Sequence, residues 1–104
     1  MIQVSFLYPD AEGSTFDFDY YIGTHCPLSK AVFGESLKLF SVERGISGIM
    51  PDSKAPFHAV GRLCFDSVEA FYAALTPHID DLKADAAKYT NVEPVIQISE
   101  IIDE

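Results

Sequence analysis

The feature that most constrains the fold is the order in which two kinds of hydrophobic periodicity follow one another. Apolar and polar residues alternate, as in β-strands, over four segments: 1–8, 37–45, 57–65 and 92–102. Helical spacing and helix-capping residues occupy the two long intervals, 15–33 and 66–88. The order β-α-β-β-α-β is that of the ferredoxin-like, or split βαβ, arrangement. It predicts an α+β fold whose four-stranded antiparallel sheet carries two helices on one face.

The length and charge of the chain limit its organisation and its partners. At 104 residues, we expect a single domain over residues 1–104. The formal net charge is −9, and the seven Lys and Arg residues are scattered. Nucleic acids and anionic membrane surfaces would be repelled, so we predict neither as a partner.

Two further absences bear on the expected compartment. No apolar run approaches the ~20 residues that a membrane span needs. No basic stretch precedes an apolar run at the N-terminus, as it would in a secretory signal. The two cysteines, Cys26 and Cys64, do not form a disulfide framework. Together these features predict a cytoplasmic protein with free thiols.

The first helical interval contains its own start and stop signals. Thr15 or Asp17 is the expected N-cap, because either side-chain oxygen can accept an unpaired N–H of the first turn. Pro27 lacks an N–H and should bend or restart the helix. A second piece is expected from Leu28 to about Phe33, before Gly34.

The second helical interval shows a similar pattern. The residues Asp66-Ser67-Val68-Glu69 resemble a capping box with Asp66 as the N-cap. The helix should run to about Leu75. Thr76-Pro77 predicts a restart, with Thr76 as cap and Pro77 at the first helical position of a helix over His78–Lys88.

The strands predict how the sheet packs. In Phe57–Phe65, Gly61 shares a face with Ala59, which indicates that a helix approaches closely there. The first and last strands carry apolar residues on both faces, such as Phe6 beside Leu7 and Val95 beside Ile96. A sheet with one solvated face should alternate more cleanly. We therefore expect a second subunit to cover the other face, giving a homodimer.

Candidate chemistry centres on one stripe of the first helix. Asp17, Tyr21 and His25 are spaced four residues apart, so their side chains are helical neighbours. Imidazole titrates near neutrality, so His25 is the candidate general acid or base, with Tyr21 hydrogen-bonded to it and holding a substrate oxygen. The structural alternatives are that His25 caps a carbonyl at the Pro27 bend and that Asp17 only caps the helix.

A second set of candidates lies on the strand 57–65. His58, Arg62 and Cys64 share one face. If that face lines a cavity, Arg62 would hold a carboxylate and His58 would shuttle protons. The structural alternative is an ion pair for Arg62 and a surface position for His58. Cys64 reads as an inert small apolar residue.

No cofactor signature is present. The three histidines have no short ligand spacing of the H-x-x-x-H kind, and no Gly-rich loop follows the first strand. We predict a protein without metal or cofactor.

Three blocks of sequence give the chain a resemblance to a known family. They are Tyr8-Pro9 with Gly13, Phe16-Asp17, Tyr20-Tyr21, His25 and Pro27-Leu28; then Phe65-Asp66-Ser67-Val68-Glu69-Ala70-Phe71; then the run from Tyr89 to Glu100. In this order they resemble the EthD family of the dimeric α+β barrel superfamily, over essentially the whole chain. That family typically has Met where this chain has Cys26.

The resemblance implies a homodimer of facing sheets, with a cleft between each sheet and its helices. Its members are often labelled oxidoreductases, and relatives include isomerases, cyclases and cofactor-free monooxygenases. One hypothesis is a small enzyme that acts on an aromatic or lactone-like catabolic intermediate through His25 and Tyr21. The others are a non-catalytic binding or accessory protein for a partner oxidase, and a dimerisation module with a vestigial pocket. The residues leave open whether the protein is an enzyme.

Overall fold

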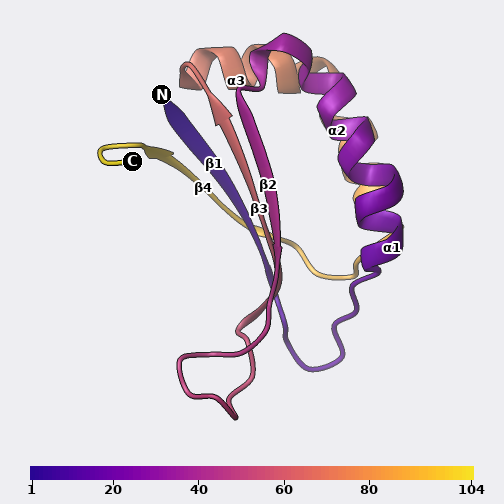
Figure 1. The fold of residues 1–104 in the computed structure, drawn as a ribbon. Coiled ribbons are helices and arrows are strands. Elements are labelled where there is room, and N and C mark those ends of the chain that lie inside the picture. The colour runs from indigo at the N-terminus through magenta and orange to yellow at the C-terminus, as the bar shows by residue number, and fades with distance from the viewer.

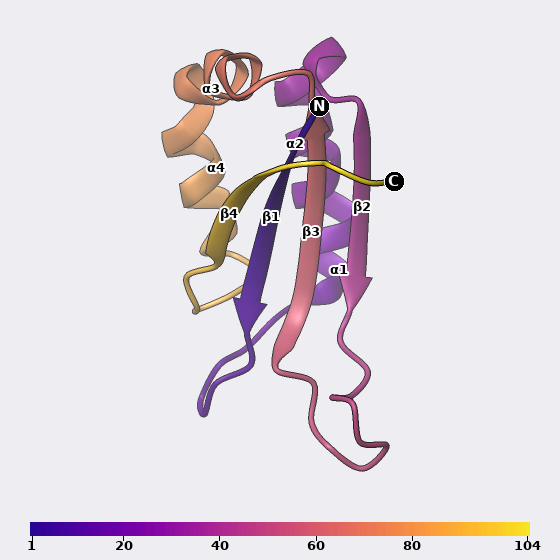
Figure 2. The ribbon, with the colours of Figure 1, turned by 90° about the vertical axis from the view of Figure 1, so that its left-hand side faces the viewer.

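The computed structural model describes residues 1–104 and contains one four-stranded antiparallel sheet. Its strands are β1 (Ile2–Pro9), β2 (Leu39–Arg44), β3 (Phe57–Phe65) and β4 (Val95–Glu100). They lie side by side in the order β2-β3-β1-β4, so the two central strands come from different halves of the chain (Figure 2). Val4 is opposite Leu63 on β3 and Ile98 on β4, which fixes the register at the centre of the sheet. The predicted α+β, ferredoxin-like architecture is confirmed.

The first helical segment is almost continuous and joins β1 to β2. It comprises the elements α1 (Phe18–Tyr20), a π-helix η1 (Tyr21–His25), α2 (Cys26–Phe33) and a 3₁₀ turn η2 (Gly34–Ser36). Asp17 is the N-cap, because its carboxylate accepts the Tyr20 N–H at 3.1 Å. The predicted restart near Pro27 is confirmed, since a separate α-helix begins at Cys26 and ends at Phe33, before Gly34. The irregularity precedes that residue as the π-helix, and Pro27 lies in the first turn of α2, where an N–H is not needed.

The second helical segment comprises α3 (Val68–Leu75), a 3₁₀ turn η3 (Thr76–His78) and α4 (Ile79–Ala86). The capping predictions here were wrong by one residue. Ser67 rather than Asp66 is the N-cap, because Ser67 is extended and its hydroxyl accepts the Ala70 N–H at 3.1 Å. Thr76 ends α3 instead of starting α4, and its hydroxyl donates to the Tyr72 carbonyl at 2.7 Å.

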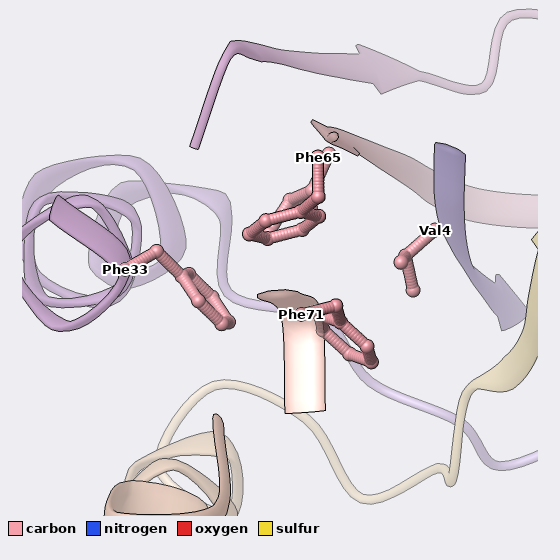
Figure 3. Packing of buried hydrophobic residues seen from close by; sticks show 5 residues of the cluster. Val4, Phe33, Phe65 and Phe71 are labelled. Atoms are coloured by element: carbon pink, nitrogen blue, oxygen red, sulfur yellow. The ribbon is translucent and has the colours of Figure 1, made fainter. Parts of the chain in front are cut away.

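Both helical segments cover the same face of the sheet (Figure 1). One of two apolar core clusters lies between them and one end of the sheet, where Val4, Phe33, Leu63, Phe65 and Phe71 are buried. The rings of Phe33, Phe65 and Phe71 converge on one another, with Phe65 5.1 Å from Phe71 and 5.2 Å from Phe33 between centroids (Figure 3). Burying such rings is the main contribution to the stability of a small domain.

The other sheet face carries no helix. Arg62 lies across it, donating to Ser5 Oγ at 3.4 Å and to Glu43 at 3.3 Å. Leu39 and Val95 lie on this face and are 63% and 55% exposed, so its apolar side chains lack a covering layer. The end of β4 and the C-terminal segment bend away on this side (Figure 1). None of the helices has the length and apolar character needed to cross a bilayer.

Two predicted strand limits were too generous. The second strand begins at Leu39 rather than at residue 37, because Leu37 ends the turn η2. The fourth strand begins at Val95, after Pro94, and ends at Glu100. The loop between β2 and β3 extends beyond the end of the sheet (Figure 2).

Candidate functional site

The π-helix determines where the candidate histidine lies. Within η1 the N–H of Cys26 donates to the Tyr21 carbonyl, five residues back, instead of to residue 22. A π-turn rotates the residues after it relative to an α-helix, and such turns are frequent at functional sites. His25 ends this turn. Its side chain is only partly buried and reaches the second helical segment.

His25 is hydrogen-bonded to Asp85 on α4. Its Nδ1 lies 2.8 Å from Asp85 Oδ2, across 60 residues of sequence. The predicted hydrogen bond from His25 to Tyr21 does not form. Their rings instead stack, with centroids 5.8 Å apart and planes 18° from parallel. The stacked Tyr21 ring fixes the plane of the imidazole, and the hydrogen bond to the Asp85 carboxylate fixes the direction of its Nδ1 atom.

Asp85 is fixed by a second donor. The Tyr20 hydroxyl donates to Asp85 Oδ1 at 2.6 Å, so each carboxylate oxygen has its own partner. Asp85 is 8% exposed. Burial would raise the pKa of this carboxyl, but the hydrogen bonds from Tyr20 and His25 outweigh that effect and hold the pKa below its ordinary value. The group is therefore an anion near neutral pH.

The charge on Asp85 assigns the imidazole tautomer. A carboxylate only accepts, so the neutral His25 ring carries its proton on Nδ1 and leaves the Nε2 lone pair free. No buried side-chain nitrogen or oxygen in the chain lacks a partner, and Nε2 has no hydrogen bond to the protein. Nε2 is therefore accessible. A histidine oriented through one nitrogen and accessible at the other is suited to proton transfer.

His25 lines a cavity of about 740 Å³ between the sheet and the helices, within the size range of small-molecule sites. Its walls are mainly apolar and come from β1, β4 and both helical segments. The wall beside His25 carries a cluster of buried side chains with polar atoms. We call these four residues the tyrosine cluster: Tyr8, Tyr21, Tyr89 and Cys26.

The tyrosine cluster is tightly packed. The hydroxyls of Tyr8 and Tyr89 are 2.8 Å apart and share a hydrogen bond. The Tyr89 ring also lies against His25, with centroids 4.6 Å apart. Burial raises the pKa of each of the three tyrosines and of the Cys26 thiol, so all four groups stay neutral near neutral pH. They are hydrogen-bond donors rather than bases.

Gly61 makes room for this cluster. A Cβ placed on Gly61 would lie 2.9 Å from the Tyr21 hydroxyl oxygen, closer than side chains normally approach. The predicted close approach of a helix over Gly61 is not what the structure has, because the group nearest to Gly61 is the tip of the long Tyr21 side chain and not the helix backbone.

Comparison with known proteins identifies the family. The EthD domain model matches residues 10–93. The chain belongs to the EthD family. An EthD-like protein from Ralstonia eutropha JMP134 is 39% identical, with a TM-score of 0.94 over 99% of this chain and 93% of the other.

More distant structures share the fold of this EthD domain. An EthD family protein from Bacillus halodurans C-125 is 24% identical, with a TM-score of 0.75 over 98% of this chain and 99% of its own. HapK from Hahella chejuensis is 17% identical, with a TM-score of 0.64 over 100% of this chain and 95% of its own. A search of curated proteins found no significant match.

The EthD domain brings together only some of the residues singled out from the sequence. His25 and Tyr21, which were predicted to be neighbours, both line the cavity. Asp17 does not, since its carboxylate caps α1. His58 lies outside the cavity, with Nε2 2.8 Å from Ser14 Oγ and its ring against Phe16. Arg62 lies on the sheet face without helices and pairs with Glu43, as its structural alternative proposed.

Four residues of the site were missed by sequence reasoning: Asp85, Tyr20, Tyr8 and Tyr89. The spacing does not single Asp85 out, because Asp81, four residues before it, is also an acid. Nothing in the sequence identifies His25 as the partner of Asp85.

Proposed function

We propose that this EthD domain binds a small, mostly apolar, oxygen-bearing molecule in the 740 Å³ cavity and moves a proton on it with His25. The substrate class is an aromatic or lactone-like catabolic intermediate. The observation that carries the proposal is the 2.8 Å contact between His25 Nδ1 and Asp85, which leaves Nε2 free beside the cavity. Asp85 stabilises the imidazolium that forms, and Tyr20 positions Asp85.

The proposed step is an enolisation. His25 Nε2 removes a proton from a carbon next to a carbonyl, and the C–H electron pair moves to form the C=C bond as the carbonyl oxygen becomes an enolate. The Tyr21 hydroxyl donates a hydrogen bond to that oxygen. The imidazolium then returns the proton to a different carbon, so the substrate is isomerised and no electrons are gained or lost.

The assay follows deuterium exchange into an uncharged aromatic ketone, 2-tetralone, in D₂O by NMR. His25→Gln keeps a polar side chain without a titrating ring and should reduce the protein-dependent rate by about 100-fold or more. His78→Gln removes an exposed histidine on η3 and is the matched control. Exchange by His25→Gln at the wild-type rate would disprove the catalytic role.

A second function, binding without chemistry for a partner oxidase, is favoured by the apolar walls of the cavity. It predicts that 2-tetralone binds to wild type and His25→Gln alike, while neither exchanges its protons faster than buffer. The label of oxidoreductase would then belong to the partner rather than to this chain.

We also propose a homodimer formed through the sheet face without helices. The support is the exposure of Leu39 and Val95 on that face, at 63% and 55%. Sedimentation should give twice the 11.5 kDa mass at micromolar concentration, and Val95→Arg should shift it towards monomer. A wild-type monomer would refute this. The cytoplasm is the proposed compartment, in keeping with two unpaired, buried cysteines.

A further inference from the structure

The deep part of the cavity contains no fixed positive charge. Besides His25, the cationic side chain on its walls is Lys83, which is exposed at the rim. Glu93, also exposed on the wall, carries the opposite charge. His25 itself faces the Asp85 carboxylate, so protonating the ring produces a neutral pair. An anion entering this space would lose water without gaining a cation.

The cavity does offer neutral donors. Tyr8 and Tyr89 have two hydroxyl protons between them, and the 2.8 Å bond that joins the oxygens uses one. The other proton remains for a ligand. Both side chains are 4% exposed or less and line the cavity, so this hydroxyl pair is buried but not closed off from a ligand. Burial disfavours the phenolate form of both groups.

The pair also lies next to the proposed base. The ring of Tyr89 packs on His25 at 4.6 Å between centroids, and Tyr8 packs on Tyr21 at 5.9 Å. An oxygen held by the Tyr8–Tyr89 pair therefore lies close to the side chains of His25 and Tyr21.

We propose that the Tyr8–Tyr89 hydroxyl pair binds an uncharged oxygen of the ligand, a ring carbonyl or hydroxyl, and that the cavity selects such neutral aromatic molecules against carboxylates. This rests on the proposed function for the location of the site, and it specifies the substrate class. Arg62, the side chain that would suit a carboxylate, is on the opposite face of the sheet.

Three probes that share one ring system test the selection at pH 7.5: naphthalene, 2-naphthol and 2-naphthoate. At this pH the naphthol is neutral and the naphthoate is ionised. Binding is measured by calorimetry or by probe fluorescence. We expect 2-naphthol to bind about fivefold more tightly than naphthalene, as one net hydrogen bond allows. We expect 2-naphthoate to bind at least tenfold more weakly than 2-naphthol.

The double variant Tyr8→Phe/Tyr89→Phe should bind 2-naphthol about fivefold more weakly and naphthalene unchanged, which also shows that the cavity is intact. Tyr72→Phe removes an exposed hydroxyl at the rim and should change neither affinity. Equal or tighter binding of 2-naphthoate, or unchanged 2-naphthol binding by the double variant, would overturn the proposal. If the double variant does not fold, the order of the three probes on wild type decides.

The outcome is separable from that of the catalytic proposal. His25→Gln should keep the preference for 2-naphthol, because the hydroxyl pair is untouched. Selective binding of 2-naphthol without proton exchange on 2-tetralone would support this inference and contradict the catalytic proposal. Proton exchange without a preference for 2-naphthol would support the catalytic proposal and contradict this inference.

Discussion

The replacement Gly61→Ala tests how tightly the tyrosine cluster is built into the sheet. The added Cβ would lie 2.9 Å from the Tyr21 hydroxyl oxygen, about 0.5 Å inside the 3.4 Å at which ordinary contact begins. The Tyr21 ring cannot swing away easily, because it packs on Phe16 at 5.0 Å and on Tyr89 at 4.9 Å between centroids.

The expected loss of stability follows from two opposing terms. Overpacking of this kind costs about 1–3 kcal/mol. Replacing glycine restricts the unfolded chain and returns about 0.4–1 kcal/mol. The net destabilisation is about 1–2 kcal/mol, which corresponds to a Tm lower by roughly 5–10 °C in a domain of this size. Urea unfolding followed by circular dichroism measures the first value and a thermal scan measures the second.

A second substitution gives the experiment its control. Tyr21→Phe removes the oxygen that the new methyl group meets, so Gly61→Ala should be tolerated in that background with a coupling of about 1 kcal/mol. Gly23→Ala is the matched control, because a Cβ there meets nothing within 4 Å. If Gly61→Ala is as stable as wild type and shows no coupling to Tyr21→Phe, the hydroxyl does not lie over Gly61.

Three further predictions concern pH and capping. The pKa of Asp85 lies below its ordinary 3.8, so its stabilisation is complete above about pH 4 and is lost as the pH falls through the lower folded value. Asp85→Asn should have a lower free energy of unfolding than wild type at pH 7, and this difference should be smaller at pH 3. Urea unfolding at both pH values measures it, and an equal difference would contradict the prediction. Burial raises the pKa values of Tyr8, Tyr21 and Tyr89 above 10.0, so the unfolded chain ionises first and stability should fall as the pH rises above about 10. Tyrosinate absorbance should then appear together with loss of the circular dichroism signal. If all three tyrosines ionise while the protein is still folded, the prediction is refuted. Ser67→Ala removes the N-cap of α3 and should lower the free energy of unfolding by about 1 kcal/mol in urea, whereas an unchanged midpoint would mean that the cap is dispensable.

Much of the architecture was predictable because it depends on local chemistry. Alternation over Phe57–Phe65 identified a strand buried on one face, and Asp17 identified a helix start. The error in the cap of α3 arose because two neighbouring residues can play the same role. Asp66 and Ser67 are both good caps, and the extended backbone at Ser67 decided between them. Pro27, by contrast, correctly indicated the start of a helix, because the first turn does not need its missing N–H.

The site was less predictable, because its key contacts join distant parts of the chain. His25 was identified from its own chemistry, and Tyr21 does lie beside it. The stripe was derived from α-helical spacing, however, and the chain forms a π-helix there, so His25 stacks on Tyr21 and bonds elsewhere. His58 and Arg62 were predicted to bind substrate from one face of their strand, yet neither lines the cavity.

The sequence by itself determined the order of strands and helices, the family, and the position of the one histidine that lines the cavity. These follow from periodicity and from residue chemistry within a few positions along the chain. Only the tertiary structure decided that Asp85 and Tyr20 hold His25, and that Tyr8 and Tyr89 share a hydrogen bond across 81 residues. The physical reason is that hydrogen bonds act over about 3 Å in space. The packing of two helical segments on one sheet face, rather than proximity in sequence, brings those groups within that distance.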